Sequence, residues 1–271
     1  MRNLWKSLEH NMDDNPISAR NVHRSAGAKR VAALWTVAIC LLGVGWATVA
    51  TSGSAPKASA FAAQTAPTAA TRALDDGRET LGGSTLAELT TQFWRWLYSI
   101  PLGVNPVSDT SGANCGINQE GDVWFLAGPA GTFTETCTIP AGKLIVSGVN
   151  EFLDDYPCPS SIPQQPAPGQ SLENFLLNDA GMVIDGVTHP AAQLDGRSLT
   201  VRRIKTQLFS FTAAASLAAF DICVTGSPQL AVSDGYFVFI KPLPRGEHVL
   251  VLTSVNPDGS NNLGTVHLKI Q

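Results

Sequence analysis

The sequence predicts an all-β domain, a β-sandwich of the jelly-roll or Ig-like type with one N-terminal amphipathic helix, preceded by a membrane-spanning signal or anchor segment. Three observations support this prediction. Residues 31–50 contain no charge and no proline, residues 85–100 carry apolar side chains at helical intervals, and residues 120–271 hold short runs of Val, Ile, Phe and Thr between turn residues. The expected segments are a basic cytoplasmic tail at 1–30, the membrane segment at 31–50, a linker at 51–80 and the β domain at 81–271.

The apolar segment 31–50 predicts export. As a helix of about 1.5 Å per residue it would span roughly 30 Å, the thickness of the hydrocarbon core. Four basic residues lie just before it, at 20, 24, 29 and 30, whereas Lys57 is the only one nearby after it. Because positive flanks stay inside, we expect a cytoplasmic N-terminus and an extracellular or membrane-anchored domain that faces outside.

The sequence leaves the cleavage of this segment open. Its apolar core is longer than the usual 7 to 15 or so residues of a signal peptide, and Trp35 and Trp46 lie near its ends as interfacial anchors would. Ala58-Ser59-Ala60, however, has the small-x-small pattern of a cleavage site. The Ala, Thr, Ser and Pro that follow, up to residue 72, indicate a linker or stalk.

The domain is expected to begin with a helix. Thr85 and Glu88 have the spacing of a capping box, and Pro101 ends the pattern. The apolar positions of this helix are Leu86, Leu89, Phe93, Trp96, Leu97 and Ile100.

Strands are expected over most of the remaining chain. The ten candidates are Val123 to Ala127, Thr132 to Thr138, Leu144 to Val149, Met182 to Asp185, Leu199 to Ile204, Leu208 to Thr212, Ile222 to Thr225, Tyr236 to Lys241, His248 to Ser254 and Gly264 to Ile270. Asp-Gly pairs at 185, 195, 234 and 258 predict tight turns.

Two stretches of this region have a distinct pattern. In the last strand Thr265, His267 and Lys269 alternate with Val266, Leu268 and Ile270, which predicts one face in water and one in the core. Residues 154–170 hold five prolines and predict a long surface loop, followed by a short helix at 171–177.

Four cysteines of the exported part predict two disulfides, because an even number in an oxidising compartment usually pairs. Three pairings are open. We favour Cys115 with Cys137, which closes a local β unit, and Cys158 with Cys223. A metal site formed by these cysteines is disfavoured because no Cys-x-x-Cys pair occurs.

Charge and motifs exclude several functions. Residues 73–271 carry ten Lys and Arg against nineteen Asp and Glu, a net charge of −9, which disfavours nucleic acid as a partner. No helical His-Glu-x-x-His pair, Gly-x-Ser-x-Gly elbow or phosphate-binding loop is present.

One acidic cluster is the candidate metal site. Asn150, Glu151, Asp154 and Asp155 lie within six residues, and oxygen ligands on a loop are what Ca²⁺ needs, although a solvated acidic loop is the alternative. No other cofactor is expected. A carboxylate pair of a glycosidase is a further alternative, formed within this cluster or by Glu151 with Asp109 or Glu120.

Aromatic side chains could stack on a glycan. Tyr156, in the polar stretch beside the acidic cluster, is the better exposed candidate ligand-binding residue, while Trp94, Trp124 and Tyr236 are weaker ones. The sequence assigns no catalytic residue.

Several segments together resemble a family of uncharacterised secreted, signal-peptide-containing bacterial proteins. They are Trp94-Arg95-Trp96, Ser99-Ile100-Pro101, Asn105-Pro106, Asp109-Thr110, Gly112-Ala113-Asn114-Cys115, residues 123–128, residues 137–143, residues 233–236 and Gly246-Glu247-His248. The resemblance implies a bacterial exported protein and carries no activity or catalytic residue.

Two functions follow as hypotheses. The first is a non-catalytic binding or structural module of the cell envelope, with the membrane as partner through residues 31–50 and a glycan or another envelope component as ligand. The second is an extracytoplasmic hydrolase that uses carboxylates or Ca²⁺, with Glu151, Asp154 and Asp155 as the acids. A concave pocket with two carboxyl groups would favour the second, and an exposed aromatic strip the first.

Overall fold

The computed structural model describes residues 79–159 and 165–271. The expected basic tail, the membrane segment 31–50 and almost all of the linker lie outside the described residues. Within residues 79–159 and 165–271, no helix is both long and apolar enough to cross a membrane.

The N-terminal helix α2 (Leu86–Ser99) forms as the sequence predicts. Thr85 caps it: its hydroxyl accepts from the Glu88 amide, and the Glu88 carboxylate accepts from the Thr85 amide at 2.8 Å. Because Pro101 cannot continue the hydrogen-bond pattern, the helix ends just before it. The apolar face of α2 is buried, so this helix packs on the domain and is not a free surface helix.

The domain consists mostly of strands arranged in two five-stranded sheets. The first sheet has the order β3-β5-β10-β8, with β9 also paired to β10. Its strands are β3 (Val123–Leu126), β5 (Leu144–Tyr156), β8 (Arg202–Lys205), β9 (Phe209–Thr212) and β10 (Pro228–Ile240). The pair β3 and β5 is parallel, and the other pairs of this sheet are antiparallel.

The second sheet has the order β4-β12-β11-β6-β7. Its strands are β4 (Thr132–Ile139), β6 (Thr188–Leu194), β7 (Arg197–Ser198), β11 (Gly246–Val255) and β12 (Asn261–Ile270). The last hairpin matches the prediction: Val266, Leu268 and Ile270 are buried, while His267 and Lys269 are exposed. Short elements complete the chain: β1 (Thr80–Leu81), β2 (Ser84–Thr85), η1 (Leu102–Val104), η2 (Pro106–Ser108) and η3 (Ala215–Ala219).

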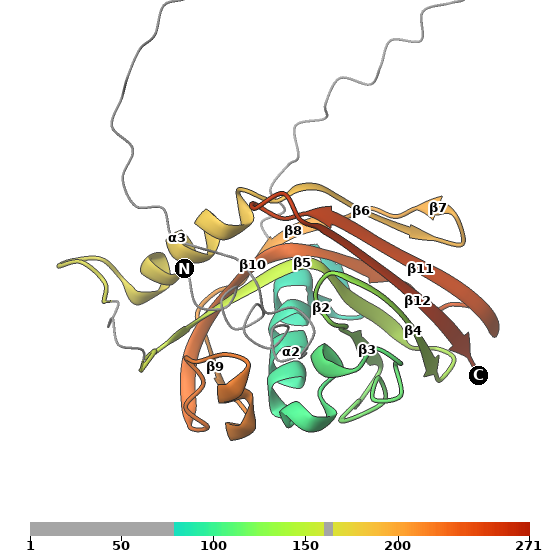
Figure 1. The fold of residues 1–271 in the computed structure, drawn as a ribbon, viewed down its shortest axis with the longest axis horizontal. Helices are drawn as coiled ribbons and strands as arrows, with labels where there is room; N and C mark the ends of the chain where they lie inside the picture. The colour runs from blue at the N-terminus through green and yellow to red at the C-terminus, as the bar shows by residue number, and fades with distance from the viewer. Residues whose placement is uncertain (1–78, 160–164) are drawn as a thin grey trace, which may run out of the picture. The chain divides into compact units, whose positions relative to one another are not determined.

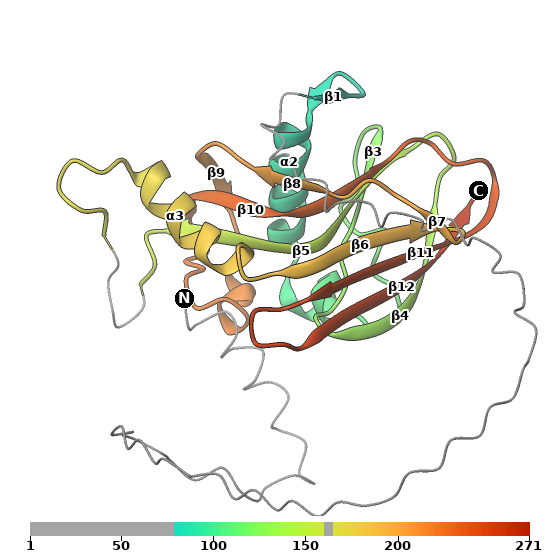
Figure 2. The same cartoon turned by 90° about the horizontal axis from the view of Figure 1, so that it is seen from above.

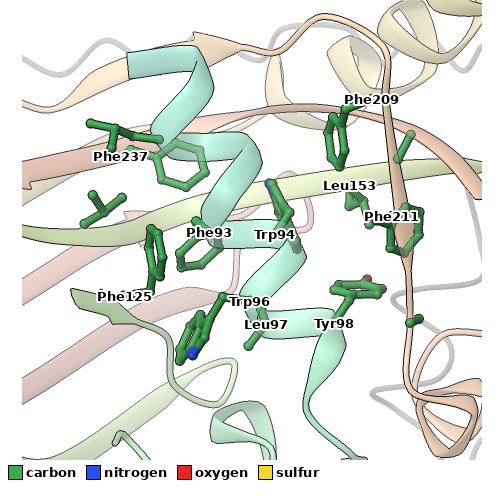
Figure 3. Packing of buried hydrophobic residues seen from close by; sticks show 14 of the residues in the cluster. Phe93, Trp94, Trp96, Leu97, Tyr98, Phe125, Leu153, Phe209, Phe211 and Phe237 are labelled. Atoms are coloured by element: carbon green, nitrogen blue, oxygen red, sulfur yellow. The ribbon is translucent and has the colours of Figure 1, made fainter. Parts of the chain in front are cut away.

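Two apolar clusters hold the layers together. In one, aromatic side chains of α2 pack on the first sheet, with Phe93 in edge-to-face contact with Phe125 and Phe237 (Figure 3). In the other, buried side chains of both sheets meet, among them Ile145 and Leu268. Figures 1 and 2 show α2 on one side of the first sheet and the second sheet on the other side.

A second helix, α3 (Leu172–Ile184), is longer than the sequence predicts. The strand expected at Met182 to Asp185 is wrong, because these residues complete α3 and its C-terminal cap. The strand expected at Ile222 to Thr225 is also absent, and residues 188–194, where no strand was expected, form β6.

The Asp-Gly pair at 234 is not a turn. Asp234 and Gly235 lie inside β10, and Asp234 is fully buried. The Arg203 guanidinium binds its two carboxylate oxygens at 2.8 and 2.7 Å and also reaches Asp185 at 2.6 Å. This paired cation is the reason that a charged side chain is tolerated inside the sheet. The other three Asp-Gly pairs lie in turns.

The strand β5 extends into the segment that was expected to be a surface loop, residues 154–170. Strand β5 continues to Tyr156, so Asp154, Asp155 and Tyr156 are paired with β10 rather than lying in a loop. These three residues resemble a loop in the sequence because polar residues occur on both faces of β5 near its end, so no clean alternation marks the strand.

The two favoured disulfides are confirmed. Cys115 is bonded to Cys137 and Cys158 to Cys223, with sequence separations of 22 and 65. The second bond ties the segment that follows β5 to the segment before β10.

Candidate functional site

A cavity of about 190 Å³ lies where β3 ends. Strand β3 pairs with Leu144 to Ser147 only, so residues 148–152 of β5 have no strand partner on that side. Helix α2, the loop after β3, and strands β4, β11 and β12 surround this unpaired edge and line the cavity together with it. The wall is largely apolar, and Glu135 and Glu151 are the charged residues among the described residues that line it.

Glu135 reaches the cavity from the second sheet. It lies in β4 on the same face as Cys137 and Ile139, which belong to the cluster between the sheets. Only 3% of its surface is exposed, and its carboxyl group has no hydrogen bond or ion pair with any other described residue. Burial, together with the nearby Asp109 carboxylate, raises the pKa of Glu135 to about 7.

Glu151 reaches the cavity from the first sheet. It shares a face of β5 with Leu153, which packs against α2. Its carboxyl group lies over Gly148, where a Cβ would collide with it, and a Cβ on the paired Gly235 would come within 2.6 Å of the Glu151 Cα. Burial raises the pKa of Glu151 to about 7, and no described residue donates a hydrogen bond to its carboxyl group.

Aromatic side chains form part of the cavity wall. Trp94 is held in place because its indole N–H donates to the Ser233 hydroxyl at 2.7 Å. The ring of Phe133 is packed between Gly128 and Gly264, where added Cβ atoms would each come within 2.6 Å of it. Figure 3 shows Trp94 on the side of α2 that faces Leu153.

Three asparagines border the cavity and connect the sheets. The Asn150 amide of β5 donates to the Asn256 side-chain oxygen at 2.7 Å and to the Ser254 hydroxyl at 3.0 Å. Asn262 of β12 donates to the same Asn256 oxygen at 2.9 Å. These hydrogen bonds give the polar side chains of both sheets partners at one side of the cavity.

The four candidate calcium ligands lie in different environments in the structure. Asn150 joins the asparagine network, Glu151 faces the α2 side of the sheet, and Asp155 accepts from Gln229 at 2.9 Å. One carboxyl oxygen of Asp154 is buried without a partner among the described residues. Burial raises the pKa of Asp154 to about 7. Calcium binding by these residues stays a prediction.

A second acidic group lies at the far end of β5. The carboxyl groups of Asp155 and Asp221 and the Cys223 sulfur offer atoms within 4.8 Å of one another. The sulfur is used in a disulfide, and Asp221 also accepts from the Tyr98 hydroxyl at 3.0 Å. Burial and the neighbouring carboxylates raise the pKa of Asp155, so the pair holds a proton more tightly than separate carboxyl groups would.

The candidate sugar-stacking residues are mostly covered. Trp94, Trp124 and Tyr236 are buried, and Tyr156 at the end of β5 is half-buried. The possible carboxylate pairs of Glu151 with Asp109 or Glu120 do not meet in the cavity wall, because neither Asp109 nor Glu120 lines it.

The sequence reasoning missed Glu135. The signal was present: in Thr132 to Ile139 the residues at 133, 135, 137 and 139 share one face, and three of these four are apolar or cysteine. An acid at the fourth position is therefore expected to point into the core.

No family model and no curated protein match the chain. Among solved structures, the chain is similar to one described as "Structure of PbICP-C in complex with falcipain-2", with 14% identity and a TM-score of 0.19. The match covers 56% of this chain and 100% of the other. At this score it supports no inference.

Proposed function

We propose that residues 81–271 form an exported β-sandwich binding module whose cavity holds a small, largely apolar molecule. The observation that carries this proposal is the cavity of about 190 Å³, with its largely apolar wall, the buried Glu135 and the half-buried Glu151. Ligand sites are typically concave and apolar, with a few polar groups that fix the orientation of the ligand.

Features outside the cavity support a location in the cell envelope. Two disulfides suit an oxidising compartment outside the cytoplasm. The apolar segment 31–50 with its basic flank supports export and, if it is retained, attachment to the membrane.

Filling the cavity tests the proposal. Leu252 lines the cavity, whereas Val251, the preceding residue of β11, points to the opposite face. We expect neutral aromatic probes such as phenethyl alcohol to raise the melting temperature of the full chain, and Leu252→Trp to abolish this shift. Val251→Trp is the matched control and should keep it. A shift that persists in Leu252→Trp would place the binding elsewhere.

A hydrolase is the second candidate, and one observation favours it. Glu135 and Glu151 line the same cavity, and each has a pKa of about 7, which suits a general acid near neutral pH. A panel of nitrophenyl glycosides and esters distinguishes the two functions. Turnover that is lost in both Glu135→Gln and Glu151→Gln supports the hydrolase, and binding without turnover supports the binding module.

A further inference from the structure

We propose that the cavity selects a small organic cation, a primary amine attached to an aromatic or aliphatic body, with its ammonium group between Glu135 and Glu151. This inference rests on the proposed binding function and adds the chemical class of the ligand. It follows from the arrangement of charge around the cavity, from the side chains that make up its wall, and from the burial of Glu135.

The charge of the cavity wall has one sign. Glu135 and Glu151 line it, and no Lys, Arg or His among the described residues does so. The buried Asp234 has its cation within the fold, Arg203 at 2.7 Å. The buried Asp155 and Asp221 have no cation but accept hydrogen bonds from Gln229 and Tyr98. Glu135, with 3% exposure, has no such partner among the described residues. Because burying an unpaired carboxylate costs free energy, a bound cationic ligand would provide the positive charge that Glu135 lacks within the fold.

The rest of the wall suits an organic body rather than a bare metal ion. Trp94, Phe133 and Phe152 contribute aromatic surface, and Val149, Leu252 and Val266 contribute aliphatic surface. A hard divalent ion prefers six or more oxygen ligands, whereas an alkylammonium ion gains from carboxylates and from aromatic faces at the same time. An anionic ligand would be repelled by both glutamates.

Binding of such a cation is linked to pH. The titratable groups that line the cavity are Glu135, Glu151 and Tyr98, and Asp109 acts on Glu135 from outside the wall. An ammonium ion binds the ionised carboxylates and therefore displaces protons from them. Its affinity should rise between pH 6 and pH 8, while the affinity of a neutral analogue should stay flat.

Three matched probes test the inference by titration calorimetry on the full chain at pH 8. They are phenethylamine, phenethyl alcohol and phenylacetate, which share a ring and differ in the charge of the tail. We expect phenethylamine to bind roughly tenfold or more tightly than the alcohol, and phenylacetate to bind most weakly. This preference requires no variant, so it stands even if a substitution impairs folding.

Variants then assign the preference to the cavity. Glu135→Gln and Glu151→Gln should each weaken phenethylamine and leave phenethyl alcohol unchanged, whereas the exposed Glu120→Gln should change neither. Equal binding of the amine and the alcohol would overturn the cation inference and leave the binding function standing. Binding of none of the three probes would contradict both.

Discussion

The carboxyl group of Glu151 occupies the space that a side chain on Gly148 would need, three residues earlier on the same strand. The two residues lie in the part of β5 that has no partner on the β3 side, beside a register shift of the ladder between β5 and β10. Gly148 therefore makes room for an acid that would otherwise have to leave the cavity. This arrangement links the sequence of one strand to the charge of the candidate site.

Replacement of Gly148 tests this relationship. Gly148 does not need a positive φ, so Gly148→Ala acts through space rather than through the backbone. We expect it to displace the Glu151 carboxyl group and to destabilise the fold by about 1 to 3 kcal/mol, the usual cost of overpacking. Urea unfolding measures the change. Gly103→Ala, with no atom within 4 Å of the added Cβ, is the control, and equal effects of the two would refute the relationship.

The hydrogen bond between Trp94 and Ser233 gives a second prediction. Both residues are buried, so Ser233→Ala leaves the indole N–H without its partner. We expect a loss of about 1 to 3 kcal/mol in the free energy of unfolding, because the desolvation penalty of a buried donor is no longer offset by a hydrogen bond. Ser210→Ala, at an exposed position of β9, should have almost no effect. A thermal melt in which both variants match the parent would contradict the role of this bond.

The buried acids predict how stability depends on pH. The pKa values of Glu135, Glu151 and Asp154 are raised to about 7 in the folded state, so the folded chain holds protons that the unfolded chain has already lost. The free energy of unfolding should therefore fall as the pH rises from about 4 to about 7, by up to roughly 1.4 kcal/mol per pH unit for each group.

Denaturant unfolding at pH 5 and pH 8 measures this dependence. Glu151→Gln should reduce it, because the amide does not titrate while Glu135 and Asp154 still do, and Glu120→Gln should leave it unchanged. Stability that rises over this interval in the parent chain would mean that the buried acids are ionised and paired in the folded state.

The two disulfides should differ in their contribution to stability. On the loop-entropy account the bond that spans 65 residues contributes about 4 kcal/mol and the one that spans 22 about 3 kcal/mol. Paired replacement of Cys158 and Cys223 by Ala should thus lower the melting temperature more than replacement of Cys115 and Cys137. The reverse order would show that local packing around Cys137, which is fully buried, outweighs loop length.

Local patterns in the sequence predict much of this fold. The capping box of α2 and the alternation of β12 depend on residues next to one another, and both form as expected. The turn predicted at Asp234-Gly235 was wrong, because Arg203 on another strand pairs with the Asp234 carboxylate and allows it to be buried inside β10. Met182 to Asp185 failed as a strand because an apolar run of four residues is also compatible with the end of a buried helix.

The candidate site was harder to predict than the fold. Glu151 was recognised from its acidic neighbours, yet its position depends on Gly148 and Gly235, of which the second lies on a different strand. Glu135 lies on β4 of the other sheet, and it shares the cavity with Glu151 because both sheets border this cavity. Such long-range contacts leave no local signal apart from the alternation within each strand.

The most direct test of the account is to locate a ligand in the protein. Crystals of the full chain soaked with para-bromophenethylamine would reveal the bromine by its anomalous scattering. The account predicts bromine density inside the cavity near Phe133, with the ammonium group beside Glu135 and Glu151. Bromine density confined to the outer surface at a saturating concentration, with the cavity unoccupied, would contradict it.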